Sequence, residues 1–116
     1  MKSLLERLTF QYLVYDKNHT SLFKKKIKVG LIYTMGAPEK IINKMGYEKL
    51  FKSSEMLMER IFGEAESLIV TDTYQFDDYS KYVATAFDPE EKLRILNNEF
   101  PKDCKKAFEL GVRLSK

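Results

Sequence analysis

The chain has 116 residues, of which 44% are hydrophobic and 32% are charged, and its formal net charge is +3 at pH 7. This length and balance fit one domain with one core, residues 1–116, and exclude a disordered chain. No cleavable leader and no long apolar run stand in the sequence, so we expect a cytoplasmic protein with no membrane partner.

The first thirteen residues predict an amphipathic helix. Leu4, Leu5, Leu8 and Tyr12 recur at helical spacing, and charged residues occupy the other side. A polar loop is expected over 16–21. The basic run that follows, Lys24–Lys26, is interpreted as a solvated loop, with a nucleic-acid or anionic surface as the alternative. Because no second basic cluster supports that alternative, we expect no nucleic-acid partner.

Residues 26–35 predict the first strand, because they form a short apolar run rich in β-branched residues. Such a run suits a parallel strand that is covered on both faces. Gly36-Ala37-Pro38 then ends the strand with turn residues, and Pro38 suits the first turn of a short helix through Lys44.

Residues 47–62 give the clearest helical pattern in the chain, and Gly63 follows as the expected stop. Residues 67–74 predict a second strand, because Leu68-Ile69-Val70 precedes two β-branched threonines. Strand, helix and strand in this order predict one right-handed βαβ unit with parallel strands.

Residues 75–87 predict an ordered loop, since four aromatic residues occur there without a helical or strand period. Asp88 suits the N-cap of a helix that continues through Glu90 and Glu91. A last helix begins at Pro101, and its apolar stripe is expected to be Cys104, Ala107, Phe108, Gly111 and Val112. Cys104 is therefore interpreted as a buried small side chain, with a reactive thiol as the alternative.

The sequence contains none of the strict catalytic motifs, so no catalytic residue is assigned. A single cysteine and a single histidine, His19, predict no intrachain disulfide and no metal site. The candidate binding place is the carboxyl end of the first strand, where ligands of open α/β sheets bind. The alternative is a plain strand-to-helix connection. The adjacent Asp77 and Asp78 are interpreted as solvated rather than as a general acid.

Several segments together resemble NAD(P)H-dependent FMN reductases and the related iron–sulfur flavoproteins. Residues 1–8 look like the helix after the third strand of that family, and residues 27–38 resemble its fourth strand and flavin-facing loop. Residues 72–79, followed by 100–104 and 107–111, are similar to the tail of one branch of the family. The resemblance implies an α/β chain that is part of a flavodoxin-like (Rossmann-like three-layer) fold, with at least two parallel strands, flanking helices and no N-terminal strands.

The same resemblance implies an FMN-dependent oxidoreductase in which NAD(P)H delivers hydride to the flavin. Carried over by position, the residues expected at the flavin are Tyr33, Thr34, Met35, Gly36, Tyr74 and Gln75. The phosphate-gripping loop of the family has no counterpart here, so the site is expected to be incomplete. A lone cysteine implies no iron–sulfur cluster.

The expected first strand would lack a neighbour on one side, and an unpaired apolar edge favours association. We therefore expect a homo-oligomer, or completion by a separate chain that carries the N-terminal half. The alternative function is a non-enzymatic, self-associating fragment or interaction module that binds no flavin.

Overall fold

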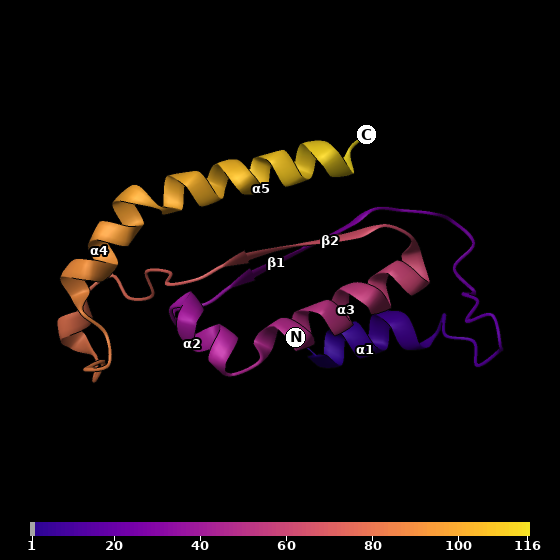
Figure 1. Cartoon of the computed structure of the whole chain (residues 1–116), viewed down its shortest axis with the longest axis horizontal. Helices are drawn as coiled ribbons and strands as arrows, with labels where there is room; N and C mark the ends of the chain where they lie inside the picture. Colours follow the sequence, from indigo (N-terminus) through magenta and orange to yellow (C-terminus); the bar gives the residue numbers. More distant parts are fainter. Residues whose placement is uncertain (1) are drawn as a thin grey trace.

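The computed structural model describes residues 2–116, and it alternates helices and strands as an α/β chain (Figure 1). The sheet is built from β1 (Val29–Thr34) and β2 (Ala65–Val70). The helical elements, in chain order, are α1 (Lys2–Phe10), α2 (Glu39–Lys44), α3 (Tyr47–Phe62), the 3₁₀ turn η1 (Tyr79–Lys81), α4 (Pro89–Asn98) and α5 (Phe100–Leu114).

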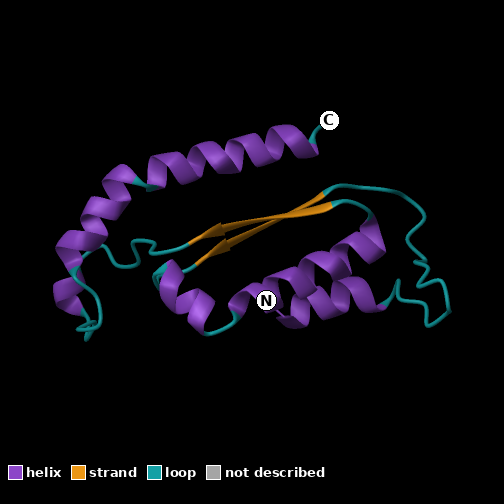
Figure 2. Cartoon of the chain, viewed as in Figure 1, coloured by secondary structure: helices purple, strands orange, loops and turns teal. Residues whose placement is uncertain are grey.

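β1 and β2 lie parallel, in a register that runs from Val29 opposite Ala65 to Thr34 opposite Val70. Helix α3 connects them, so the predicted pair of parallel strands joined by a helix is confirmed. Helices cover both faces of this sheet: α3 packs on one face with α1 beside it, and α5 packs on the other (Figure 2). The mixed α/β class is therefore confirmed.

The main core lies between α3 and the segment that precedes β1. Ile61 is fully buried and Met58 and Phe62 nearly so, because α3 repeats its apolar residues at helical spacing and turns them to the sheet. Tyr12 and Phe23 close this core by packing edge-to-face, with ring centroids 5.2 Å apart. The long connection from α1 to β1 is thereby held against α3.

A second buried cluster lies near the carboxyl ends of the strands. Tyr33 of β1 packs on Phe51 of α3 with ring centroids 4.3 Å apart, and Ile42 of α2 completes the cluster. The odd-numbered residues of β1 therefore face α3, while the even-numbered ones face α5.

Helix α5 approaches β1 closely because Gly30 has no side chain. A Cβ at Gly30 would lie 2.6 Å from Leu114 Cδ1, and Leu110 packs beside it. The face of α5 toward the sheet is thus centred on Leu110, with Asp103 and Ala107 at its margins.

The expected apolar stripe of α5 was wrong, and with it the buried Cys104. Cys104 is exposed, and Phe108 and Val112 on the same stripe are also exposed. Two apolar stripes run along α5, one with Cys104, Phe108 and Val112 and the other with Leu110 and Leu114. The leucine stripe faces the sheet, because Gly30 has no side chain and leaves room for both leucines.

The expected bounds of the strands were partly wrong. The first strand was expected over 26–35 and spans 29–34, and the second was expected over 67–74 but spans 65–70. Asp72 has a φ of 60°, which leaves the extended region and ends the pairing with β1. β-branched residues in 71–73 therefore reflect loop packing and not a strand.

The helix ends agree better with the sequence. The helix over 47–62 has the expected bounds, and Gly63 follows it with a φ of 132°. Asp88 caps α4, because its side chain accepts hydrogen bonds from the backbone N–H groups of Glu90 and Glu91. The first helix ends at Phe10, three residues earlier than expected.

Among the described residues, no helix has the length and apolar character needed to cross a membrane.

The fully buried position of Ile61 predicts a large loss of stability on truncation. We expect Ile61→Ala to lower the free energy of unfolding by about 3 kcal/mol, because it removes buried methyl groups and leaves a cavity. Ile41→Ala, at a position 44% exposed on α2, should cost less than about 1 kcal/mol. Urea unfolding followed by circular dichroism measures both, and equal losses would contradict this description of the core.

Candidate functional site

The loops that follow β1 and β2 are joined by backbone hydrogen bonds. Met35 N–H donates to Val70 O at 2.9 Å, and Thr73 N–H donates back to Met35 O at 3.0 Å. Asp72 N–H donates to Ala37 O at 3.0 Å. The two carboxyl ends therefore form one ordered rim rather than two independent turns.

A buried lysine, Lys92, contacts both loops of this rim. Lys92 of α4 is only 4% exposed, and its Nζ donates to Gly36 O at 2.5 Å and forms an ion pair with the Asp72 carboxylate. The ring of Phe87 lies 5.0 Å from the same ammonium group. Each charge is thus compensated by the other, and α4 is tied to both loops.

Sequence reasoning missed this lysine. Lys92 stands between the helix start at Asp88 and Leu93, where a charged residue is expected to be solvated. A buried role depends on Asp72, twenty positions away, and no local pattern links the two residues.

The rim brings together part of the expected flavin-contacting set. Thr34 is exposed, and Met35 and Gly36 are half-buried beside it. Gly36 faces Gln75, since a Cβ at Gly36 would lie 3.0 Å from Gln75 Oε1. Thr34, Met35, Gly36 and Gln75 therefore share one end of the sheet.

The two expected tyrosines lie elsewhere in this arrangement. Tyr33 is 8% exposed, packs on the α3 face, and its buried hydroxyl has no hydrogen-bond partner. Tyr74 packs edge-to-face on Tyr79 with centroids 5.2 Å apart. Tyr79 in turn accepts a hydrogen bond from Gln75 N–H at 3.2 Å, so these aromatic rings order the loop that carries Gln75.

An apolar groove of about 620 Å³ runs along the outer edge of β1. Its floor and walls come from three parts of the chain: β1 and the residue after it supply Ile32 through Met35, α3 supplies the largest share, and α1 supplies Leu5 and Glu6. The α3 residues are Tyr47, Leu50, Phe51, Ser53, Ser54 and Leu57. Leu50 and Ile32 are 55% and 52% exposed, so large apolar side chains border this edge without cover.

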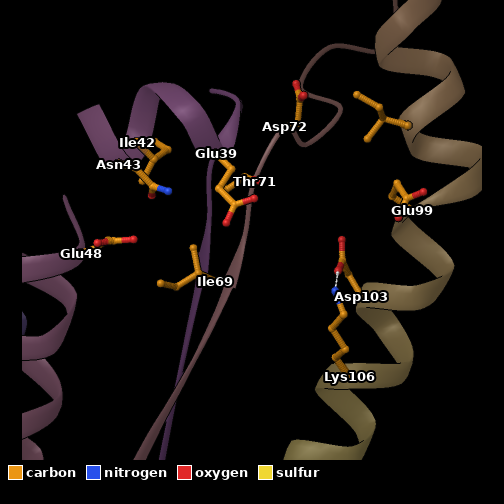
Figure 3. Close-up of a pocket in the computed structure, with 11 residues that line it drawn as sticks. Glu39, Ile42, Asn43, Glu48, Ile69, Thr71, Asp72, Glu99, Asp103 and Lys106 are labelled. Atoms are coloured by element: carbon orange, nitrogen blue, oxygen red, sulfur yellow. Dashed lines mark hydrogen bonds and ion pairs between the residues drawn. The ribbon is translucent and has the colours of Figure 1, made fainter. Parts of the chain in front are cut away.

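A second cavity, of about 460 Å³, lies at the other edge of the sheet, beside β2 (Figure 3). Its lining is acidic: carboxylates from α2, α3, the β2 loop, α5 and the residue before α5 surround Ile69. These carboxylates are Glu39, Glu48, Asp72, Glu99 and Asp103. Asp103 pairs with Lys106 at 2.8 Å, and Glu99 pairs with Lys102 at the same distance. Within residues 2–116, no group of acidic, histidine or cysteine side chains is placed to hold a metal ion.

Comparisons with protein-family models, with curated proteins and with solved structures found no match to this chain.

The Lys92–Asp72 pair predicts the response of the rim to mutation. Lys92→Ala leaves a partly buried carboxylate without its partner, so we expect the free energy of unfolding to fall by about 3 kcal/mol. Lys81→Ala, which removes an exposed pair with Asp78, should change it by less than about 0.5 kcal/mol. Denaturant unfolding of the two variants makes the comparison, and a silent Lys92→Ala variant would show that the pair does not anchor the rim.

Proposed function

We propose that the chain is the distal half of a flavodoxin-like domain and that the rim at the carboxyl ends of β1 and β2 binds FMN in an NAD(P)H-dependent oxidoreductase. One observation carries the proposal: the loops after two adjacent parallel strands are hydrogen-bonded into a single rim. Ligands of open α/β sheets bind at this end of the strands.

The residues of the rim fit the edge of a flat heteroaromatic ring. Thr34 offers an exposed hydroxyl, Met35 a polarizable thioether and Gln75 an exposed amide, and the missing side chain of Gly36 leaves room for the Gln75 amide beside the rim. When bound, the flavin supplies the hydride and electron chemistry. The chain's own residues orient the ring and limit the access of water to one of its edges.

The flavin phosphate needs a second set of residues. Lys92 is the buried cation nearest the rim, and Asp72 and Gly36 O already occupy it. We infer that further cationic side chains or free backbone N–H groups for the phosphate lie across the outer edge of β1, beyond Thr34.

A second candidate function is an interaction module that binds no flavin. The apolar groove along β1 favours it, because uncovered apolar surface beside a strand edge marks a protein-binding site. The two functions differ in one simple property, which is whether the purified protein takes up flavin.

Titration with FMN tests the proposed site. We expect saturable binding at micromolar concentrations, with quenching of flavin fluorescence. Gln75→Ala should weaken the affinity about three- to tenfold, because it removes one hydrogen bond to the ring edge. Gln11→Ala serves as the matched control, since Gln11 is an exposed glutamine at the end of α1.

Two outcomes would contradict the flavin proposal. The first is a protein that leaves FMN fluorescence unchanged at hundreds of micromolar, which would favour the interaction module. The second is equal weakening by Gln75→Ala and Gln11→Ala, which would place the flavin elsewhere. A parallel titration with riboflavin, which lacks the phosphate, measures how much the phosphate contributes to the affinity.

A further inference from the structure

The outer edge of β1 presents backbone groups that its neighbour β2 does not reach. The odd-numbered residues pair with β2: Val29 N–H donates to Glu64 O at 2.8 Å and Met35 N–H to Val70 O at 2.9 Å. Because successive residues of a strand direct their N–H and C=O groups to opposite edges, the groups of Gly30, Ile32 and Thr34 point outward. These three residues form a template for another strand.

Apolar side chains flank this edge on the face of the sheet that α3 covers. On this face lies the groove formed with α3 and α1. On the other, Arg113 of α5 forms an ion pair with Glu66 of β2, which fixes the side of α5 that lies over β2. Cys104 and Phe108 lie about 120° and 160° around the helix from Leu110, which faces the sheet, so both point away from it. Phe108 is 73% exposed.

The outer side of β2 has the opposite character. Six of the eleven residues that line the cavity beside it are charged, namely five carboxylates and Lys106 (Figure 3). Charged side chains of this kind protect a sheet edge from pairing with other strands. The chain therefore has one protected edge, at β2, and one edge prepared for pairing, at β1.

We propose that a second copy of this chain covers the β1 edge, in antiparallel orientation around a two-fold axis through Ile32. Ile32 then lies opposite Ile32 of the second copy, and Gly30 lies opposite its Thr34. The outward-facing residues of both strands pair completely, with about six backbone hydrogen bonds, since each directly opposed pair exchanges two. The result is a four-stranded sheet in the order β2, β1, β1 and β2.

The distribution of charge selects this orientation. Lys24, Lys25 and Lys26 precede β1 and are exposed, so each copy carries a basic segment at the amino end of this strand. Antiparallel pairing places the basic starts of the two copies at opposite ends of the strand pair. A parallel arrangement would place the basic starts side by side and would leave a free edge on each added copy.

This assembly goes beyond the proposed function, and it names the chain that faces the candidate flavin rim. In the stated register, Lys28 of the second copy lies opposite Gly36, two residues beyond Thr34. The Lys28 ammonium group pairs with Glu64 of its own chain at 3.4 Å, so the second copy brings this ion pair to the side of the rim where the flavin phosphate would lie. The assembly itself depends only on the strand edge, so it is tested without flavin.

Mass measurement by light scattering at increasing protein concentration tests the pairing. We expect the full-length chain to be a dimer at tens of micromolar. Ile32→Lys should raise the dissociation constant at least tenfold, because it places two like charges at the axis. Ile69→Lys is the matched control, since Ile69 is an exposed isoleucine on β2, and it should leave the dimer unchanged.

Disulfide trapping tests the register and keeps the inference falsifiable if Ile32→Lys fails to fold. Directly opposed hydrogen-bonded residues have Cα atoms about 5.5 Å apart, within the range of a disulfide. In a Cys104→Ser background, Ile32→Cys should form a covalent dimer on mild oxidation, and Ile69→Cys should not.

A monomer at tens of micromolar would overturn the proposal. So would equal cross-linking of the two cysteine variants, or a dimer that Ile69→Lys disrupts as strongly as Ile32→Lys. A chain that becomes dimeric or larger only after a different polypeptide is added would assign the edge to that polypeptide instead. Loss of flavin binding with the dimer intact would contradict the proposed function alone.

Discussion

The outer edge of β1 is the constraint on which the rest of this molecule depends. Two parallel strands form its whole sheet among the described residues, so each strand has one side without a backbone partner. At β2 that side is bordered by carboxylates, and at β1 it is bordered by Ile32 and Leu50. Exposed apolar side chains are costly in water, and the unpaired backbone groups beside them can pair with another strand, which makes this edge the natural place for a partner.

The rim at the carboxyl ends of the strands differs from this edge, because its polar groups already form hydrogen bonds within the chain. Lys92 holds Asp72 and Gly36 O, and backbone bonds join the two loops. Such a rim is pre-organised: it can offer Thr34, Met35 and Gln75 to a ligand without first ordering them, and this lowers the entropic cost of binding. The ordered rim and the unpaired outer edge of β1 thus meet at Thr34, where β1 ends.

Sequence patterns predicted the elements of the fold where one local rule decides them. The repeat of apolar residues in 47–62 predicted the correct bounds of α3. Asp88 predicted the start of α4, because capping is a local interaction. The βαβ arrangement followed from the order of these elements. The carboxyl end of β2 was not predicted, because Asp72 leaves the extended region where it pairs with Lys92 and Ala37, which lie far from it in the sequence.

The candidate site was predictable in part for the same reason. The carboxyl end of β1 could be located from the turn at Gly36, yet the burial of Tyr33 depends on Phe51 of α3, and the role of Lys92 depends on Asp72. The orientation of α5 was mispredicted, because the absent side chain of Gly30 decides which of two stripes faces the sheet. These are all contacts between distant segments, which periodicity along one segment does not encode.

Amide hydrogen exchange along β1 measures the state of its outer edge most directly. If the edge is paired, the amides of Gly30, Ile32 and Thr34 exchange as slowly as those of Leu31 and Tyr33, and dilution makes the even-numbered positions exchange faster. If the even-numbered amides exchange rapidly at every concentration while the odd-numbered ones stay protected, the edge is bare in solution and the central claim fails.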